Sequence, residues 1–347
     1  MKYQKVFVDS IGYELPPVVV TSSELEARLK PMYEALHISE GQLEALTGII
    51  ERRWWEEGYE LSTGAIAAAR KTLASSGVRP EDIEVLVYAG VCRESFEPAT
   101  ACRVAAGLGV NTGATVYDIS NACLGVLNGM IDIANRIELG QIKAGLVVSC
   151  ETARPINDIM IEDMLKAKSM ELFMTSLATL TGGSGAVAVL LTDGSFSSTK
   201  RTKLIGGVTR TAPEYYGLCR WGINAQEANL FTQTMSTDSV SVMKYGVKLG
   251  ALTWKAFLEE LNWTGDQVDK IICHQVGSAH QDLILKTLGI QAEKDFPTYA
   301  YLGNMGTVSL PLTAALAEEN EFFNPGDRVG FLGIGSGLNC LMLGLVW

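Results

Sequence analysis

Cys123 stands at a position where a cysteine can act as a nucleophile. Residues 114–140, ATVYDISNACLGVLNGMIDIANRIELG, predict a buried strand, a sharp polar turn and an amphipathic helix that opens at this cysteine. The positive end of the helix dipole and the unpaired N–H groups there favour a thiolate, so we predict a lowered pKa for Cys123. The alternative is an inert core thiol, because free cysteines are often buried and this chain has 7 of them.

Two polar residues in the second half of the chain occupy comparable places. His274 directly follows the apolar strand predicted by KIICHQV, and Asn304 lies in the tight turn of LGNMG. We expect both loops to lie at the same face of the protein as Cys123. A satisfied core histidine is the alternative for His274, although the chain has only 3 histidines. The turn GIGSG, residues 333–337, predicts closely approaching N–H groups, so Ser336 and Cys123 could together form an oxyanion hole.

A tryptophan- and arginine-rich segment could bind a nucleotide. It is TGIIERRWWEEG, residues 47–58, in which Arg52 and Arg53 could contact phosphate and Trp54 could stack on a base. The alternative is a packed surface loop. Together with Arg220, these three residues are the candidate CoA-binding residues.

Composition limits the classes of protein that need consideration. The chain has 347 residues, of which 47% are hydrophobic and 19% charged, so it can bury a large core in two structural units. A net charge of −11 without a basic run argues against nucleic acid and anionic membranes as partners. The cysteines form no CxxC pair, which argues against a zinc site. With no signal-peptide core and no apolar run long enough to span a membrane, we expect a cytoplasmic protein.

The elements that must position these residues recur within the chain. Helix, acidic loop and strand follow one another in the same order in both halves, about 184 residues apart. The repeat pairs Leu86 with Ile271, Asn121 with Asn304, and Val147 with Phe331. We therefore predict an internal duplication, with one half at residues 1–198 and the other at 199–347.

The order of helices and strands in each half predicts an α/β unit with a mixed sheet covered by helices. Two such units packed together make a duplicated five-layer αβαβα sandwich, with ligands at the strand ends near the pseudo-twofold axis. Only the first half carries an insertion, residues 154–182. Its methionines could line a channel for a long alkyl chain, although a packed core is the alternative. They are Met160, Met164, Met170 and Met174.

These motifs, taken together, resemble the thiolase superfamily. TGIIERR, the NACLGVLNGM turn, HQV, GNMG and GIGSG resemble the branch that contains 3-oxoacyl-ACP synthase III and hydroxymethylglutaryl-CoA synthase, in order along the whole chain. Within it, GGVTRTAPEYYGLCRWG and the terminal GIGSGLNCLMLGLVW are most similar to the OleA enzymes of long-chain olefin biosynthesis. The resemblance implies that Cys123, His274 and Asn304 form a catalytic triad. It also implies the duplicated sandwich as the fold.

One departure from the synthase III pattern bears on the chemistry. Glu97, in SFEPATA, stands where synthase III usually has a phenylalanine that reaches across the dimer interface. An enzyme that condenses two ordinary acyl-CoAs must remove an α-proton, and a carboxylate in an apolar channel can do so. The resemblance implies a homodimer in which each subunit supplies Glu97 to the other. A solvated loop residue is the alternative for Glu97. HQVG in place of HQAN and GSG in place of GGG are further departures.

The activity implied is a non-decarboxylative Claisen condensation of two fatty acyl-CoA thioesters through an acyl-cysteine. The product would be a 2-alkyl-3-ketoacyl-CoA or a 3-keto acid. No cofactor and no metal are expected beyond the CoA thioesters, and downstream olefin-pathway enzymes are further candidate partners. Three alternatives stay open: a decarboxylating synthase III that uses malonyl-ACP, an acyltransferase or ketide synthase of a secondary pathway, and a catalytically silent subunit of a hetero-oligomer.

Overall fold

The computed structural model describes residues 1–196, 202–223 and 233–347. Its main feature is a sheet of nine strands in the order β11-β12-β13-β8-β1-β7-β6-β4-β5. The first half of the chain supplies β1 (Phe7–Glu14), β4 (Val85–Ala89), β5 (Thr115–Ile119), β6 (Ala144–Glu151) and β7 (Gly185–Thr192). The second half supplies β8 (Thr202–Thr211), β11 (Lys270–Cys273), β12 (Arg328–Gly335) and β13 (Asn339–Val346).

The two halves of this sheet repeat the same pairing. Strands β4 and β6 are parallel with Val87 opposite Val147, and β11 and β12 are parallel with Ile272 opposite Phe331. In both halves an antiparallel strand follows, β7 or β13, which then pairs with β1 or β8. The halves meet where Phe7 of β1 lies opposite Lys203 of β8. The predicted boundary between residues 198 and 199 lies outside the described residues.

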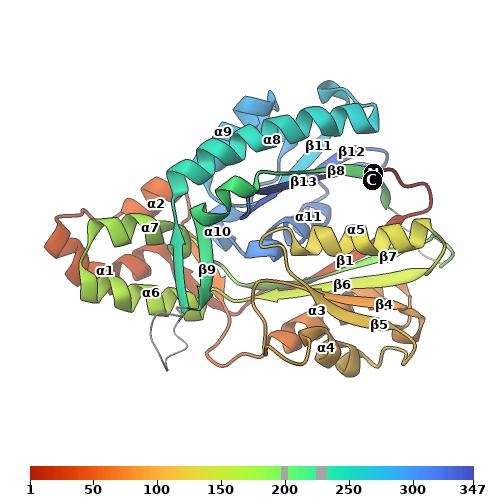
Figure 1. Ribbon diagram of the computed structural model, residues 1–347, viewed down its shortest axis with the longest axis horizontal. Coiled ribbons are helices and arrows are strands. Elements are labelled where there is room, and N and C mark those ends of the chain that lie inside the picture. Colours follow the sequence, from red (N-terminus) through yellow and green to blue (C-terminus); the bar gives the residue numbers. More distant parts are fainter. Residues whose placement is uncertain (197–201, 224–232) are drawn as a thin grey trace.

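Helices complete a five-layer arrangement, which confirms the predicted fold class (Figure 1). The outer layer of the first half holds α3 (Leu61–Ser76) and α4 (Thr100–Leu108), and that of the second half holds α8 (Ser239–Leu261) and α9 (Ser278–Leu288). Between the two half-sheets lie α5 (Gly125–Glu138) and α11 (Ser309–Glu319). A central helix must be apolar or small on most sides, and α11 accordingly buries eight of its eleven residues.

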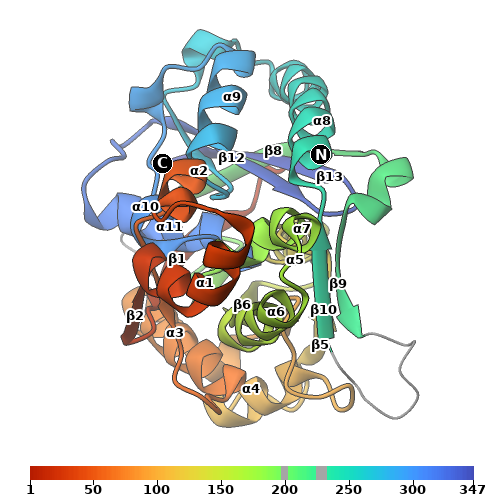
Figure 2. The ribbon, with the colours of Figure 1, turned by 90° about the vertical axis from the view of Figure 1, so that its left-hand side faces the viewer.

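The remaining elements gather at one end of the sandwich (Figure 2). They include the antiparallel pair of β2 (Val18–Thr21) and β3 (Glu51–Trp54) and the β9–β10 hairpin (Cys219–Ile223 and Gln233–Thr237). The helices are α1 (Ser22–Leu36), α2 (Gln42–Thr47), α10 (Tyr299–Leu302) and, in the insertion, α6 (Arg154–Ala167) and α7 (Met170–Leu180). An apolar cluster joins α1, α6 and α7 to Trp54. This end of the molecule therefore has a core of its own, which borders the pocket described below.

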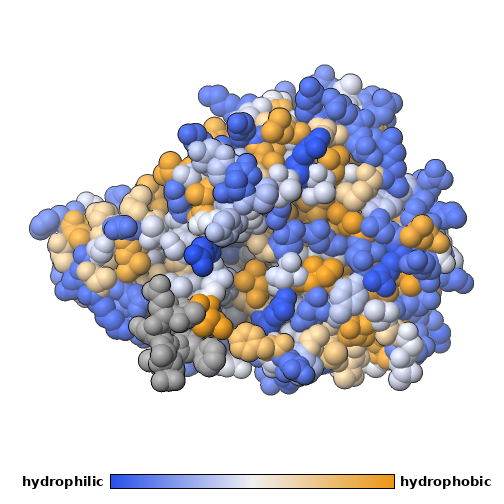
Figure 3. Space-filling view, in the orientation of Figure 1, coloured by the Kyte–Doolittle hydropathy of each residue, from blue (hydrophilic) through white to orange (hydrophobic). Residues whose placement is uncertain are grey.

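The face of the protein seen in Figure 3 is largely polar. In the space-filling view, hydrophilic side chains are spread over the face and hydrophobic residues occur as separate small patches (Figure 3). Among the described residues, no helix has the length and hydropathy needed to cross a membrane. Within the same residues, no cluster of His, Cys, Asp and Glu is arranged to hold a metal ion.

Candidate active site

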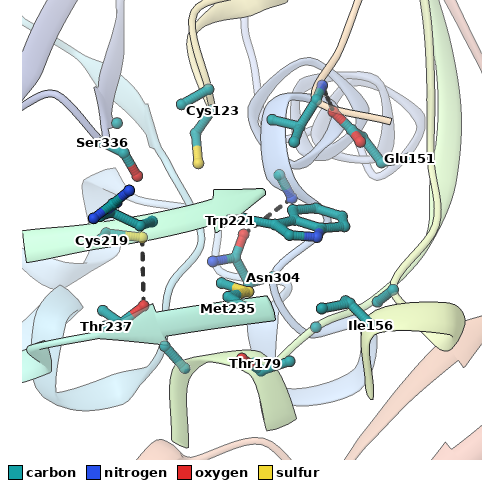
Figure 4. Close-up of a pocket in the computed structure, with 18 of the residues that line it drawn as sticks. Cys123, Glu151, Ile156, Thr179, Cys219, Trp221, Met235, Thr237, Asn304 and Ser336 are labelled. Atoms are coloured by element: carbon teal, nitrogen blue, oxygen red, sulfur yellow. Dashed lines mark hydrogen bonds between the residues drawn. The ribbon is translucent and has the colours of Figure 1, made fainter. Parts of the chain in front are cut away.

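A cavity of about 910 Å³ opens where the two halves of the sandwich meet the elements gathered at its end, here called the end cluster. It brings Cys123, His274, Asn304 and Ser336 together, as the sequence predicts. Its other walls come from the end of β6, from α6 and α7, and from the β9–β10 hairpin. Figure 4 shows Cys123 and Ser336 at one end of the pocket, with Trp221 and Met235 of the hairpin beyond them. The cavity is large enough for extended acyl groups, and several apolar side chains line it.

The turn before α5 holds Cys123 in a constrained backbone. Strand β5 ends at Ile119, and Ala122 adopts a left-handed φ of 45°, an unfavourable conformation for a residue with a Cβ. The helix then begins at Gly125, and the N–H of Val126 donates to the Thr307 hydroxyl at 2.8 Å. The start of the helix after Cys123 is thus held by a residue from the second half of the chain.

The C-terminal turn lies directly against Cys123. A Cβ on Gly335 would come within 3.3 Å of the Cys123 nitrogen, so the glycine permits this close approach. Asn339 donates to Asn121 at 3.0 Å, and Asn121 donates to Asn128 at 2.7 Å. These three asparagines, whose hydrogen bonds sequence reasoning missed, tie the turn that carries Cys123 to the turn that carries Ser336. Their residue type alone gives no signal, because each finds its partner only in the folded chain.

The predicted lowering of the Cys123 pKa is wrong. Burial raises the pKa of this thiol to about 12, and the neighbouring Cys219 and Glu151 act in the same direction. The helix dipole is outweighed because the thiol is desolvated and a first-turn N–H of α5 is already used by Thr307. Cys123 is therefore a neutral thiol at neutral pH, and it can act as a nucleophile only if a base removes its proton.

Because its pKa is raised, Cys123 should react slowly with iodoacetamide, and the rate should rise about tenfold per pH unit from about pH 7 to pH 10. Peptide mass spectrometry after timed alkylation measures this rate for each cysteine. The exposed Cys102 serves as an internal control and should react faster than Cys123 at about pH 7. A Cys123 rate that is already constant below about pH 8 would contradict the raised pKa.

His274 lines the same cavity as Cys123. It follows β11, its side chain is only 5% exposed, and its backbone N–H donates to Leu332 at 3.0 Å. Burial lowers the pKa of His274 to about 3, with a further contribution from His280. The imidazole is therefore neutral at physiological pH, the form that can accept a proton from a thiol or donate an N–H to an oxyanion.

Asn304 is fixed by bonds that leave its amide nitrogen available. The backbone N–H of Asn304 donates to Thr181 at 2.9 Å, and its Oδ1 accepts from Gly306 at 3.0 Å. Gly303 has a φ of 67°, and a Cβ there would meet the Thr181 oxygen at 2.5 Å, so only glycine suits this turn. With Oδ1 occupied, Nδ2 is the atom that can donate to a ligand in the pocket.

Glu97 does not line the pocket of its own chain. It lies in the exposed loop between β4 and α4, next to Phe96, whose side chain is 89% exposed. A different carboxylate lines the pocket: Glu151 at the end of β6 is buried and accepts from Val91 at 2.9 Å and Cys92 at 3.0 Å. Burial raises the pKa of Glu151. Sequence reasoning missed it, although an acidic residue at the end of an apolar strand is a usable signal.

Two of the four candidate CoA-binding residues are structural. The Arg52 side chain is buried and donates to the Ser22 hydroxyl at 3.0 Å and the Leu180 carbonyl at 3.1 Å, so it cannot bind phosphate in this conformation. Trp54 is also buried, and its indole N–H donates to Gly182 at 3.0 Å. The predictions for both residues are wrong because alternate residues of β3 point into the core.

The other two candidates are more accessible, but only one lies at the pocket. Arg53 is half-buried on the opposite face of β3 and donates to the Pro16 carbonyl at 3.4 Å, and it does not line the cavity. Arg220 is exposed in β9 and lines the cavity. Arg220 is therefore the candidate cation with direct access to a bound ligand.

The insertion lines the cavity, but its methionines do not. The residues of the insertion that line the wall are Ile156, Asn157, Ala178, Thr179 and Gly182. Met160 and Met164 pack in the core of the end cluster, whereas Met170 and Met174 are 46% and 47% exposed. The methionines that do line the cavity are Met235 and Met305, from outside the insertion. The prediction rested on the flexibility of methionine side chains, which does not indicate which side of α6 and α7 faces the pocket.

A duplicated five-layer fold with a cysteine, a histidine and an asparagine at one pocket defines a condensing enzyme of the thiolase superfamily. Residues 258–347 match the family model of the 3-oxoacyl-[acyl-carrier-protein] synthase III C terminal. The chain is 57% identical to the acyl-CoA:acyl-CoA alkyltransferase of Shewanella oneidensis and 35% identical to that of Xanthomonas campestris, each match covering all of both chains. It belongs to the acyl-CoA:acyl-CoA alkyltransferase (OleA) family.

Solved structures agree with this assignment. A structure of Xanthomonas campestris OleA with bound lauric acid and lauroyl-CoA is 34% identical, with a TM-score of 0.93, over 99% of this chain and 100% of that chain. A cerulenin-bound structure of the same OleA is also 34% identical, with a TM-score of 0.94, over 100% of this chain and 98% of the other. The resemblance predicted from the sequence motifs is confirmed.

Proposed function

We propose that this enzyme condenses two fatty acyl-CoA thioesters head to head without decarboxylation. The observation that carries the proposal is the convergence of Cys123, His274 and Asn304 on one large pocket with apolar walls. The relatives named acyl-CoA:acyl-CoA alkyltransferase support it, as does an OleA structure with bound lauroyl-CoA. The substrates are therefore fatty acyl-CoAs.

In the first half-reaction, the neutral His274 takes the proton of the Cys123 thiol while sulfur attacks the thioester carbon. The N–H groups of Cys123 and Ser336 stabilise the oxyanion that forms. The carbon–sulfur bond to CoA then breaks, the CoA sulfur takes a proton, and an acyl-Cys123 remains. The close approach of Gly335 to the Cys123 nitrogen supports this placement of the oxyanion hole.

In the second half-reaction, a second acyl-CoA places its carbonyl oxygen between His274 and Nδ2 of Asn304. These donors stabilise the enolate that forms when a base removes the α-proton. The enolate carbon attacks the acyl carbon, the bond to Cys123 breaks, and a 2-alkyl-3-ketoacyl-CoA forms. Its hydrolysis would give the 3-keto acid. The base is Glu97 of the partner subunit of a homodimer.

The loop that carries Glu97 suits a contribution to another subunit. Phe96 and Glu97 project into solvent, whereas Glu151 fixes the beginning of the loop through Val91 and Cys92. An exposed phenylalanine beside a carboxylate on a loop fixed in this way is suited to insertion into a partner. Arg220 would bind the CoA phosphates. The free cysteines support work in a reducing cytoplasm, where downstream olefin-pathway enzymes would consume the product.

The substrate assignment is tested with two saturated acyl-CoAs of different chain length and no malonyl donor. We expect two self-condensed and two cross-condensed products by mass spectrometry, because either thioester can acylate Cys123 and either can form the enolate. Parallel reactions with malonyl-ACP and one acyl-CoA are the control. Products that appear only with malonyl-ACP would contradict the proposal and support a decarboxylating synthase. Acyl transfer to another acceptor would support the acyltransferase alternative.

A further inference from the structure

A second, much smaller cavity of about 20 Å³ lies beside the catalytic pocket. His274 and His280 line both cavities. The rest of the wall of the small cavity is formed by glycines, thiols and apolar side chains, among them Ile284, Leu332 and Met342. In the described part of the chain, no carboxylate, lysine or arginine lines it. Its volume is sufficient for one water molecule.

The imidazole of His274 has an unsatisfied nitrogen. Nδ1 is buried and has no hydrogen-bond partner within the described residues, although the side chain is only 5% exposed. A buried polar atom of this kind is costly unless it is paired. A catalytic histidine also needs a partner at its second nitrogen, because that bond fixes the ring and its tautomer. His280, in the first turn of α9, is the other imidazole at the small cavity.

We propose that His280 is a positioning residue for His274. One water molecule in the small cavity links His280 to Nδ1 of His274, and this link orients the catalytic imidazole. The role rests on the proposed function, in which Nε2 of His274 serves the reaction in two ways. Nε2 accepts the thiol proton in the first half-reaction, which requires a proton on Nδ1. Nε2 donates to the enolate in the second, which is compatible with a bare Nδ1.

A neutral His280 can pair with Nδ1 of His274 whether or not Nδ1 carries a proton. Its ring has one N–H and one lone pair, so through a water it can accept from Nδ1 or donate to it. Burial lowers the pKa of His280 to about 4, and that of His274 is lowered to about 3, so both rings are neutral at physiological pH. Burial also raises the pKa values of Cys273 and Cys340, so the thiols in the wall carry no charge. A carboxylate in the place of His280 could only accept.

The test uses nitrogen-15 NMR of the imidazoles, because the chain has only 3 histidines. The variants are His280→Gln, which keeps a donor and an acceptor, and His280→Leu, which keeps neither. The exposed His37 provides the control variant His37→Gln. In the wild-type enzyme we expect one neutral tautomer of His274, which does not protonate between about pH 6 and 7. In His280→Leu the Nδ1 and Nε2 shifts of His274 should move toward a mixture of tautomers, and in His280→Gln they should stay closer to the wild type.

Kinetics provide the second readout. His280→Leu should lower kcat for condensation about tenfold or more with little change in KM, His280→Gln should recover part of the loss, and His37→Gln should match the wild type. Unchanged His274 shifts together with unchanged kcat in His280→Leu would overturn the proposal. If His280→Leu does not fold, a wild-type His274 that protonates between about pH 6 and 7 would overturn it. The NMR result does not require condensation, so a wild-type enzyme without condensed product would refute the proposed function separately.

Discussion

A Cys123→Ala enzyme should form no acyl-enzyme and lose condensing activity by at least about 10⁴-fold, because no other group in the mechanism can carry the first acyl chain. In the wild-type enzyme, incubation with a long-chain acyl-CoA should add one acyl mass to the peptide that contains Cys123 and release one CoA. Peptide mass spectrometry and a thiol assay for free CoA measure these two quantities.

The matched control is Cys102→Ala, which removes an exposed thiol outside the pocket and should leave both quantities unchanged. Cys219 is the more demanding comparison, because it lines the same cavity as Cys123. An acyl group found on Cys219 and absent from Cys123 would show that the nucleophile has been assigned wrongly.

Glu97→Gln should separate the two half-reactions. Glutamine keeps the size and hydrogen bonding of the side chain but cannot accept the α-proton, so Cys123 should still become acylated while condensation falls by about 10³-fold. Rapid-quench measurement of acyl-Cys123, together with product analysis, tests both steps. The control is Glu57→Gln, another exposed carboxylate that does not line the pocket, which should behave as the wild type.

Mixing subunits tests whether Glu97 acts across a dimer interface. A Cys123→Ala subunit paired with a Glu97→Gln subunit holds one site with both functional groups, so complete subunit exchange in an equal mixture should restore about a quarter of wild-type activity. Glu151→Gln provides a contrast, because Glu151 lines the pocket of its own chain. Condensation at the wild-type rate in Glu97→Gln, with loss in Glu151→Gln, would assign the base to Glu151.

The fold was predictable because its signals are local and occur twice. Leu86 and Ile271, paired by the repeat, lie at equivalent positions in β4 and β11, and the strand registers of the two halves agree. Strand ends also indicated where Cys123 and His274 would lie. The side-chain types of Arg52 and Trp54 suggested nucleotide binding, but their alternation along β3 determined their burial.

The protonation state of Cys123 could not be predicted from its own segment. It depends on Cys219 in β9, on Glu151 in β6 and on desolvation by the C-terminal turn, all distant along the chain. The same reason explains why the roles of Glu151, Asn121 and Asn339 were missed. Each takes its role from a partner that only the folded chain brings near, such as Val91 for Glu151.

The bond from Val126 to Thr307 has a consequence for how the enzyme matures. It joins residues 181 positions apart, and the bond between Asn339 and Asn121 spans 218 positions. Contacts of such separation form only after large loops have closed, so they belong to the slow part of folding. The turn that carries Cys123 is therefore assembled when the two halves dock, and a nascent chain whose first half alone has emerged from the ribosome holds Cys123 without the contacts from Thr307 and Asn339.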